Sequence, residues 1–210
     1  MLLRHKRSER GNAAIEFGLA MIVLIPILFG TVAFGINLGN VLQATQITRD
    51  VAHMYAEGVD FSQTGNQNIV VQLVQGLGGL TANGGNGVLI LSQIQEIYQA
   101  DCAAGGYATS QCANLGSRVF INRVVIGNSA LRTSNYGTPN PAYISANDNI
   151  GSTNFLTKAD DQALNFTDSV LPQTQGQIAY VVEGYFATPN LSFLGGFTGD
   201  TAGVYTVAIF

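Results

Sequence analysis

The strongest pattern in the chain is an apolar run near its N-terminus, from Ala13 to Asn37, interrupted by Glu16, Pro26 and Thr31. As a helix this run reaches about 36 Å, enough to cross a hydrocarbon core of about 30 Å. A cleaved secretory signal fits less well, because its apolar stretch is only about 7–15 residues long and ends in small residues. The run therefore predicts one membrane-spanning helix.

The helical pattern continues beyond the apolar run. Apolar or small side chains recur every three or four residues as far as Tyr55, and Gly58 stands where a helix-ending glycine is expected. We therefore expect one helix over Ala13–Glu57, about 68 Å long, whose outer half needs a partner for its apolar stripe. A second, shorter helix is predicted over Asn66–Leu77, where the Gly-rich segment Gly76–Gly87 ends it.

The rest of the chain changes to a strand pattern. Segments rich in Val, Ile, Tyr and Phe predict four strands, at Val88–Gln99, Arg118–Gly127, Gln177–Ala187 and Gly203–Phe210. Alternation in the second strand is partial, which favours a sheet with one buried face. The segment Asn128–Leu156 is polar and predicts a surface loop. The expected fold class is α+β: a long N-terminal helix packed on a small antiparallel sheet, with a second short helix.

The distribution of charged residues predicts the orientation of the membrane-spanning helix and excludes some classes of partner. Four basic residues precede the run, and the next one along the chain is Arg49, so the N-terminus is expected in the cytoplasm. The residues beyond the run include 5 basic and 11 acidic ones, which gives 5 − 11 = −6 for the exported body. This charge argues against nucleic acid as a partner. The leading basic residues are Arg4, Lys6, Arg7 and Arg10.

Cys102 and Cys112 are the only two cysteines. A pair so close together in an exported domain suggests a local disulfide, which would contribute on the order of 3 kcal/mol by closing the loop. Two buried thiols are the alternative. A metal site is less consistent with the sequence, because neither His5 nor His53 lies near the pair. We expect no metal and no cofactor.

The order of residues from Arg10 to Phe17 resembles the type IV prepilins, with Gly11 following basic residues and Glu16 five residues later. The resemblance implies that a membrane aspartyl protease, the prepilin peptidase, cuts between Gly11 and Asn12. Asn12 stands where many prepilins have Phe or Met, so methylation of its amine is not carried over. The sequence over residues 7–55 is similar, more closely, to the TadE-like family of the tight-adherence (Tad) pilus systems. The similar residues are Arg10-Gly11, Ala14 to Ala20, Pro26, Phe29-Gly30 and Phe34-Gly35.

Glu16 is the residue to which the resemblance gives a role. A charged side chain within the hydrocarbon costs about 2.5–3.5 kcal/mol even on lenient scales, so a lone acid there has a use. The resemblance implies that the Glu16 carboxylate pairs with the new α-amino group of Asn12 on a neighbouring subunit. The alternative is that Glu16 reaches the headgroups from a shallow position. Pro26 removes one backbone hydrogen bond, which indicates either a local melt of the helix or a tolerated kink.

Residues that could support catalysis or metal binding are few. His53 has no other histidine or free thiol within reach, so it cannot form a standard nucleophile–base pair. We expect it on the helix surface. Asp160 and Asp161 are adjacent in a polar segment and are expected to be solvated. The segment Asp60 to Thr64 has the D-x-S-x-T spacing of a metal-dependent adhesion site but follows a helix, which argues against that fold. We expect no catalytic residues.

The expected function is that of a minor pilin or pseudopilin, processed by prepilin peptidase and used in assembling, priming or capping a Tad-type pilus. Its partners would be the inner membrane, the peptidase and other pilins or Tad-system membrane proteins. The alternative is an uncut single-pass inner-membrane scaffold or binding protein of the pilus or secretion apparatus; a membrane-anchored hydrolase is a third possibility. The expected parts are a leader (1–11), a membrane-spanning half-helix (12–37), an extracytoplasmic half-helix (38–58) and an extracytoplasmic α+β domain (59–210).

Overall fold

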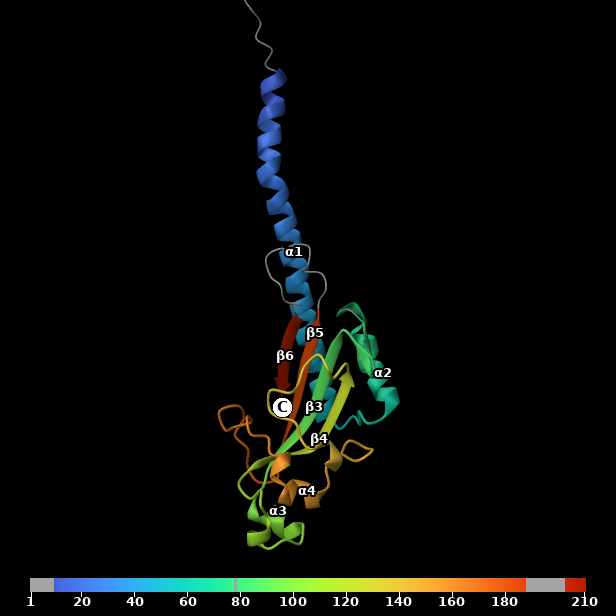
Figure 1. Cartoon of the computed structure of the whole chain (residues 1–210), viewed down its shortest axis with the longest axis vertical. Coiled ribbons are helices and arrows are strands. Elements are labelled where there is room, and N and C mark those ends of the chain that lie inside the picture. The colour runs from blue at the N-terminus through green and yellow to red at the C-terminus, as the bar shows by residue number, and fades with distance from the viewer. Residues whose placement is uncertain (1–9, 78, 188–202) are drawn as a thin grey trace, which may run out of the picture. The chain divides into compact units, whose positions relative to one another are not determined.

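The computed structural model describes residues 10–77, 79–187 and 203–210, and only the backbone of residues 10–12 (Figure 1). The chain divides into two compact units, Met1–Gly39 and Asn40–Phe210. Helix α1 (Arg10–Ala56) begins in the first unit and ends in the second. Its 47 residues agree with the helix predicted over Ala13–Glu57.

The remaining elements belong to the second unit and form an α+β domain. Its helices are α2 (Thr64–Leu73), α3 (Gln99–Ala104) and α4 (Ser152–Thr157), with 3-10 turns η1 (Gln75–Leu77), η2 (Thr109–Gln111), η3 (Pro141–Tyr143) and η4 (Ala159–Asp161). Its strands are β1 (Leu80–Thr81), β2 (Gly84–Gly85), β3 (Gly87–Glu96), β4 (Arg118–Gly127), β5 (Ile178–Ala187) and β6 (Gly203–Ile209).

The main sheet has four antiparallel strands in the order β4-β3-β5-β6 (Figure 1). The pairing of β3 with β4 shifts between Gln93 and Ile94, so that Ile121 forms a bulge in β4. Strands β1 and β2 form a separate small hairpin. The four long strands and their antiparallel arrangement confirm the fold class expected from the sequence.

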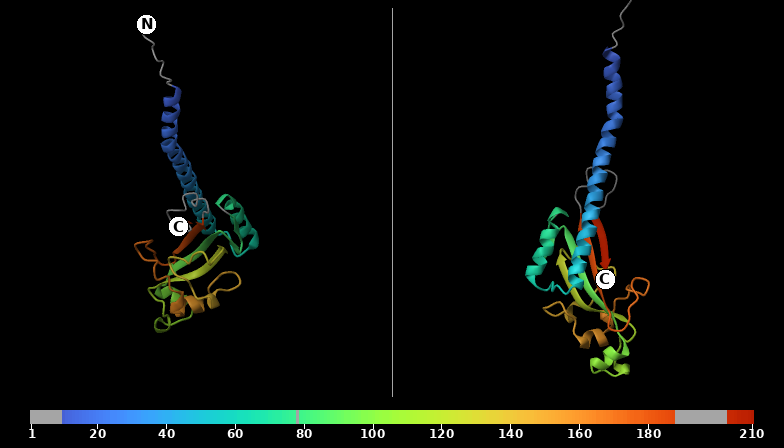
Figure 2. Two further views of the ribbon diagram at one scale, coloured as in Figure 1. Left: turned by 45° about the horizontal axis from the view of Figure 1, so that its top comes forward. Right: turned by 180° about the vertical axis from the view of Figure 1, so that it is seen from behind.

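One face of the sheet packs on the last turns of α1 (Figure 2). Side chains from α1 such as Val51 and Tyr55 are buried against Leu89, Leu91 and Val182 of the sheet. Burying a large aliphatic or aromatic side chain stabilises a fold by about 1.5–3 kcal/mol, so this cluster is the main core of the domain. The apolar stripe of the outer half of α1 therefore has the partner that its pattern required.

Helix α1 ends in a two-bond C-terminal cap. Gly58 has a φ of 90°, which glycine adopts without a steric penalty. The Gly58 N–H donates to Tyr55 O at 3.1 Å and the Val59 N–H donates to Met54 O at 3.0 Å, the bond pattern of a Schellman motif. The predicted helix end at Gly58 is therefore correct.

The second face of the sheet is also covered, which the sequence did not predict. A second core cluster joins Ile94, Phe120 and Val181 of the sheet to Ile150 and Phe166 of the long segment between β4 and β5. Partial alternation in β4 therefore reflects burial on both faces, and the expectation of a single buried face was wrong.

Three predicted boundaries also differ from the structure. The strand expected to reach Gln99 ends at Glu96, because Asp101 accepts the Tyr98 N–H at 2.8 Å and starts α3. The loop expected over Asn128–Leu156 contains η3 and most of α4, and its Ile150 and Leu156 are buried. The helix expected over Asn66–Leu77 is α2, which ends at Leu73 and is followed by η1, and the Gly-rich segment beyond it contains the β1-β2 hairpin.

Candidate functional site

The first part of α1, up to Gly39, presents apolar side chains at its surface. Ile22 and Phe34 are each 69% exposed, and most of the other large apolar residues of this stretch are also exposed. The helix is long and apolar enough to cross a membrane, and none of its most apolar 18-residue window is buried. Exposed apolar surface of this extent marks a segment that contacts lipid or another protein. It fits a single-pass membrane protein.

Glu16 is the only charged residue between Arg10 and Arg49. It lies within α1, and its side chain is exposed. The ion pairs among the described residues are the two made by Arg118, so neither involves Glu16. The predicted cut site, Gly11 and Asn12, lies in the first turn of the same helix. Among the side chains that the structure describes, none neutralises the charge of Glu16.

Pro26 lies in the middle of this exposed stretch, and α1 is assigned as helix on both sides of it. Gly18, Gly30, Gly35 and Gly39 are distributed along the same stretch, and a Cβ at each would find no atom within 4 Å in the described structure. Each glycine costs a helix about 1 kcal/mol relative to alanine. Packing within the described chain does not require these glycines, whereas close approach of a second helix would use them.

The second half of α1 makes a close contact with the sheet at Thr48. Its hydroxyl donates to Ala44 O at 2.9 Å and lies 2.5 Å from the Thr206 hydroxyl of β6. Facing it on β5 is Gly184, where a Cβ would lie 2.5 Å from Thr48 Oγ1. Any side chain at residue 184 would therefore push the helix and sheet apart. This contact was not predicted from the sequence. The signal that could have indicated it was Gly184, a glycine within a predicted strand, which often marks close approach of another backbone.

A buried hydrogen bond also joins the end of α1 to the sheet. The Tyr55 hydroxyl donates to Asn122 Oδ1 of β4 at 2.6 Å, and burial raises the pKa of Tyr55 above its ordinary value. Asn122 in turn donates through Nδ2 to Asn149 Oδ1 at 2.8 Å. This chain of hydrogen bonds connects α1, the sheet and the segment after β4.

Two buried charges hold the long segment on the second face of the sheet. Glu183 of β5 is 2% exposed and accepts the Asn135 N–H and the Tyr205 hydroxyl, at 2.8 and 2.7 Å. Arg123 of β4 donates to Gly137 O at 2.6 Å. Burial lowers the Arg123 pKa to about 10, and the charge of Glu183 opposes this change. The signal that could have found Glu183 was a lone acid in the apolar strand Ile178–Ala187.

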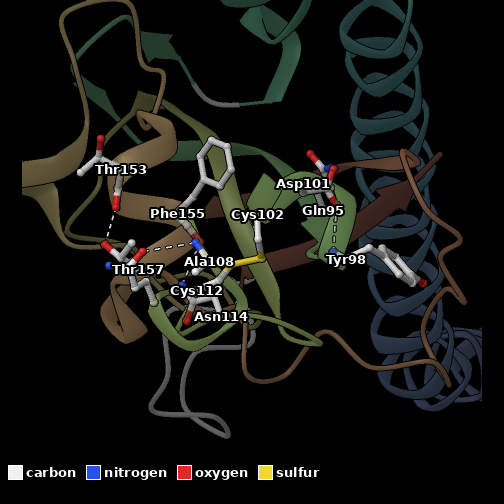
Figure 3. Close-up of a disulfide and its surroundings, with 11 residues drawn as sticks. Gln95, Tyr98, Asp101, Cys102, Ala108, Cys112, Asn114, Thr153, Phe155 and Thr157 are labelled. Atoms are coloured by element: carbon white, nitrogen blue, oxygen red, sulfur yellow. Dashed lines mark hydrogen bonds between the residues drawn. A yellow bond between two sulfur atoms is a disulfide. The ribbon is translucent and has the colours of Figure 1, made fainter. Parts of the chain in front are cut away.

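The two cysteines form a disulfide that closes a small lobe between β3 and β4 (Figure 3). Cys102 lies in α3 and its Cα is 5.9 Å from that of Cys112. Both are buried in a third apolar cluster with Leu156 of α4. Just beyond the bridge, Asn114 Nδ2 donates to Phe155 O and to Lys158 O, each at 2.8 Å. The bridge therefore helps to hold the lobe against α4.

Removing this bridge is expected to destabilise the domain. Changing both Cys102 and Cys112 to alanine should lower the free energy of unfolding by about 2–4 kcal/mol, because the unfolded chain regains the entropy of the open loop. Urea titration of the full chain in detergent, followed by circular dichroism, measures this change. Adding a reductant should destabilise the wild-type chain and leave the double variant unchanged. Equal stability of the oxidised wild type and the variant would contradict the prediction.

The candidate catalytic side chains are not brought together. His53 is exposed on α1, as predicted, and its ring centroid lies 4.1 Å from that of Phe210. Asp160 is exposed, whereas Asp161 is fully buried, so the expectation that both are solvated was wrong for Asp161. Burial raises the Asp161 pKa to about 6, and the backbone of Asn140 and the charge of Asp160 affect it less. Its place in η4, beside the edge of β4, explains the burial.

The raised Asp161 pKa predicts a pH-dependent stability. The folded chain holds this proton more tightly than the unfolded chain, whose Asp titrates near 3.9, so stability is lost as the pH rises from about 4 to about 6. Asp161→Asn should therefore stabilise the chain by about 1–3 kcal/mol at pH 7 and have little effect at pH 4. Urea titrations at the two pH values measure this. The matched control is Asp160→Asn, which should show no such difference; a pH-independent effect of Asp161→Asn would contradict the account.

The D-x-S-x-T segment forms a turn that leads into α2. The Asp60 carboxylate accepts the Ser62 hydroxyl at 2.7 Å and the Ser62 N–H at 2.9 Å. These two hydrogen bonds, and a third from Gln63, lower the pKa of Asp60. Among the described residues, no group of three His, Cys, Asp or Glu side chains is placed to hold a metal ion. Asp60 thus serves the local fold of this turn.

Taken together, the described residues form an α+β protein with one helix that is long and apolar enough to span a membrane, followed by a four-stranded antiparallel sheet. A family model for TadE-like proteins matches residues 11–53, which are 43 of the 210 residues. The chain is similar to that family over α1, and the resemblance drawn from the sequence is confirmed there. Comparisons with curated proteins and with solved structures gave no match.

This similarity falls on the exposed apolar helix, the part of the chain that is long and apolar enough to cross a membrane. The matched segment begins at Gly11 and leaves the preceding basic residues outside it. It ends at His53, before the sheet begins, so the body carries no family assignment of its own.

Proposed function

We propose that this chain is a minor pilin or pseudopilin of a Tad-type pilus, cut by prepilin peptidase between Gly11 and Asn12. The observation that carries the proposal is Glu16: the one charged residue between Arg10 and Arg49, exposed near the start of an apolar stretch that matches TadE-like proteins. An unpaired charge is costly in lipid, and pairing it with an opposite charge on a second subunit offsets part of that cost. The proposed role is assembly, priming or capping of the pilus.

Each segment of the chain would then have a separate role in the pilus. Residues 1–11 are the basic leader, which stays in the cytoplasm, and residues 12–37 form the part of α1 that leaves the bilayer for the filament. Residues 38–58 carry the apolar stripe that packs on the sheet, and residues 59–210 form the extracytoplasmic body. The exposed glycines and the large apolar surface of α1 support helix-to-helix packing in a filament. Pro26 would ease the local unwinding of α1 on extraction.

Processing is tested by the mass of the chain in membranes from cells with and without prepilin peptidase. We expect the wild-type chain to begin at Asn12 only where the peptidase is present. Gly11→Leu should remain uncut in both strains, because a side chain at this position hinders entry of the backbone into the protease cleft. Gly18→Leu is the matched control and should be cut normally. An intact leader in both strains would favour the uncut membrane scaffold instead.

A further inference from the structure

A pocket of about 220 Å³ lies between the end of α1, the turn before α2, the sheet and the tip of the turn at residues 145–149. It is smaller than the roughly 300–1,000 Å³ of pockets that hold drug-sized ligands, so its occupant is a small group. Its polar lining residues are Tyr55, Asp60, Gln93, Asn122, Asn147 and Asn149. Val59 and Val124 add apolar surface to the wall.

Hydrogen bonds already fix several of these side chains. Tyr55 and Asn122 use their polar atoms on each other and on Asn149, which sets the orientation of the Asn149 amide. The turn that carries Asn147 and Asn149 is closed by the Asp148 N–H, which donates to Ser145 O at 2.9 Å, and Asp148 has a φ of 61°. The Ser145 hydroxyl donates to Asn147 Oδ1. The pocket is therefore preorganised, which lowers the entropy cost of binding.

Other polar groups in the pocket have no partner. Within the described residues, the side-chain amide of Gln93 makes no hydrogen bond, and Asn149 uses only its Oδ1. An amide offers both donors and an acceptor. The Asp60 carboxylate, on the rim, has acceptor sites beyond the three hydrogen bonds that it receives. The pocket thus presents donors and acceptors together.

The charge of the lining restricts the ligand further. Asp60 is the one charged side chain among the described lining residues, and no lysine or arginine lines the pocket. Anions are disfavoured by this charge, and a purely apolar group would leave the amides unpaired. Vicinal hydroxyl groups match a mixture of donors and acceptors, because each hydroxyl donates one hydrogen bond and accepts others.

We propose that this pocket binds one neutral sugar residue of a glycan. This function goes beyond the proposed pilus role and does not depend on processing. Two sources offer the same chemistry: the amino-sugar polymer of a cell wall and the hexoses of an extracellular polysaccharide. Both present a ring with several adjacent hydroxyls, which is the feature that the amides would recognise.

The test uses the full chain in phosphocholine nanodiscs, which carry no sugar headgroup that could compete. Saturation-transfer NMR would follow titrations with glucose, galactose, mannose and N-acetylglucosamine, the last also as β-1,4-linked oligomers, up to about 50 mM. We expect saturable binding of at least one neutral sugar with a Kd in the millimolar range. Preference for the N-acetylglucosamine series identifies cell-wall glycan, and preference for a hexose identifies extracellular polysaccharide. Glucuronate should bind at least about tenfold more weakly than glucose because of Asp60.

Two variants test the location of the site. Gln93→Ala and Asn147→Ala should each raise the Kd at least about tenfold, while Gln95→Ala should change it less than about twofold. Gln95 is the matched control, because it lies two residues along β3 and its amide donates to Asp101 outside the pocket. Circular dichroism confirms that each variant is folded. The proposal is overturned by no saturable binding of any neutral sugar, by equal binding in Gln93→Ala, Asn147→Ala and wild type, or by Ca²⁺ alone occupying the pocket.

Discussion

Glu16→Gln is expected to reduce the amount of this chain in sheared pili at least tenfold. If Glu16 pairs with the Asn12 α-amino group of a neighbouring subunit, the variant leaves that ammonium unpaired in apolar surroundings. Breaking a buried pair in this way costs about 3–5 kcal/mol, more than enough for a tenfold change in a binding equilibrium. Quantitative immunoblotting of the pilus and membrane fractions measures the change.

A loss of Glu16→Gln from pili is informative only if this variant is produced and processed like the wild type. Membrane levels of Glu16→Gln and the start of its mature chain at Asn12 should equal those of the wild type. Thr31→Val is the matched control, because Thr31 is also a polar residue in the exposed part of α1 and its hydroxyl donates to Leu28 O of its own helix. It should enter pili normally. Wild-type incorporation of Glu16→Gln would mean that the carboxylate merely reaches the headgroups.

Gly184→Val is expected to destabilise the α+β domain by about 2–4 kcal/mol. Even the first added carbon would lie 2.5 Å from Thr48 Oγ1, and Thr48 is held by Ala44 and Thr206 on either side. The helix or β5 must therefore shift, and neighbouring core contacts are lost with it. Urea unfolding of the full chain in detergent, followed by circular dichroism, gives the change in stability.

A pair of controls separates this clash from a general effect of replacing glycine. Gly65→Ala in α2 has open space around its Cβ and should stabilise the chain by about 0.4–1 kcal/mol. Adding Thr48→Ala to Gly184→Val should recover part of the lost stability, because the clashing hydroxyl is removed. Strictly additive effects of the two substitutions would show that residue 184 does not set the distance between α1 and the sheet.

The sequence predicted those parts of the fold that a local pattern determines. Periodicity and Gly58 gave the length and end of α1, and the β-branched runs gave the four long strands. Short elements were missed where a single side chain decides the structure, as when Asp101 caps α3. The burial of Ile150 and Leu156 could not be predicted either, because a polar segment with scattered apolar residues gives no periodic signal.

The candidate functional residues also fall into two groups, those that a local sequence pattern reveals and those that only the folded structure reveals. Gly11, Glu16 and Pro26 can be recognised from the sequence alone, because they lie at characteristic spacings along one predicted helix. Glu183, Asp161 and the polar pocket beside Tyr55 depend on segments far apart in the chain meeting in space. Long-range contacts of this kind have no local sequence period. The structure was therefore needed to find the buried charges and the pocket of the α+β domain, whereas the sequence already indicated the candidate residues of α1.

The mass of the N-terminal peptide in sheared, purified pili tests most directly whether this chain is a processed pilus subunit. We expect the chain to be present in this fraction and to begin at Asn12, with no peptide from residues 1–11. A chain confined to the membrane fraction, or one that still carries its leader, would contradict it.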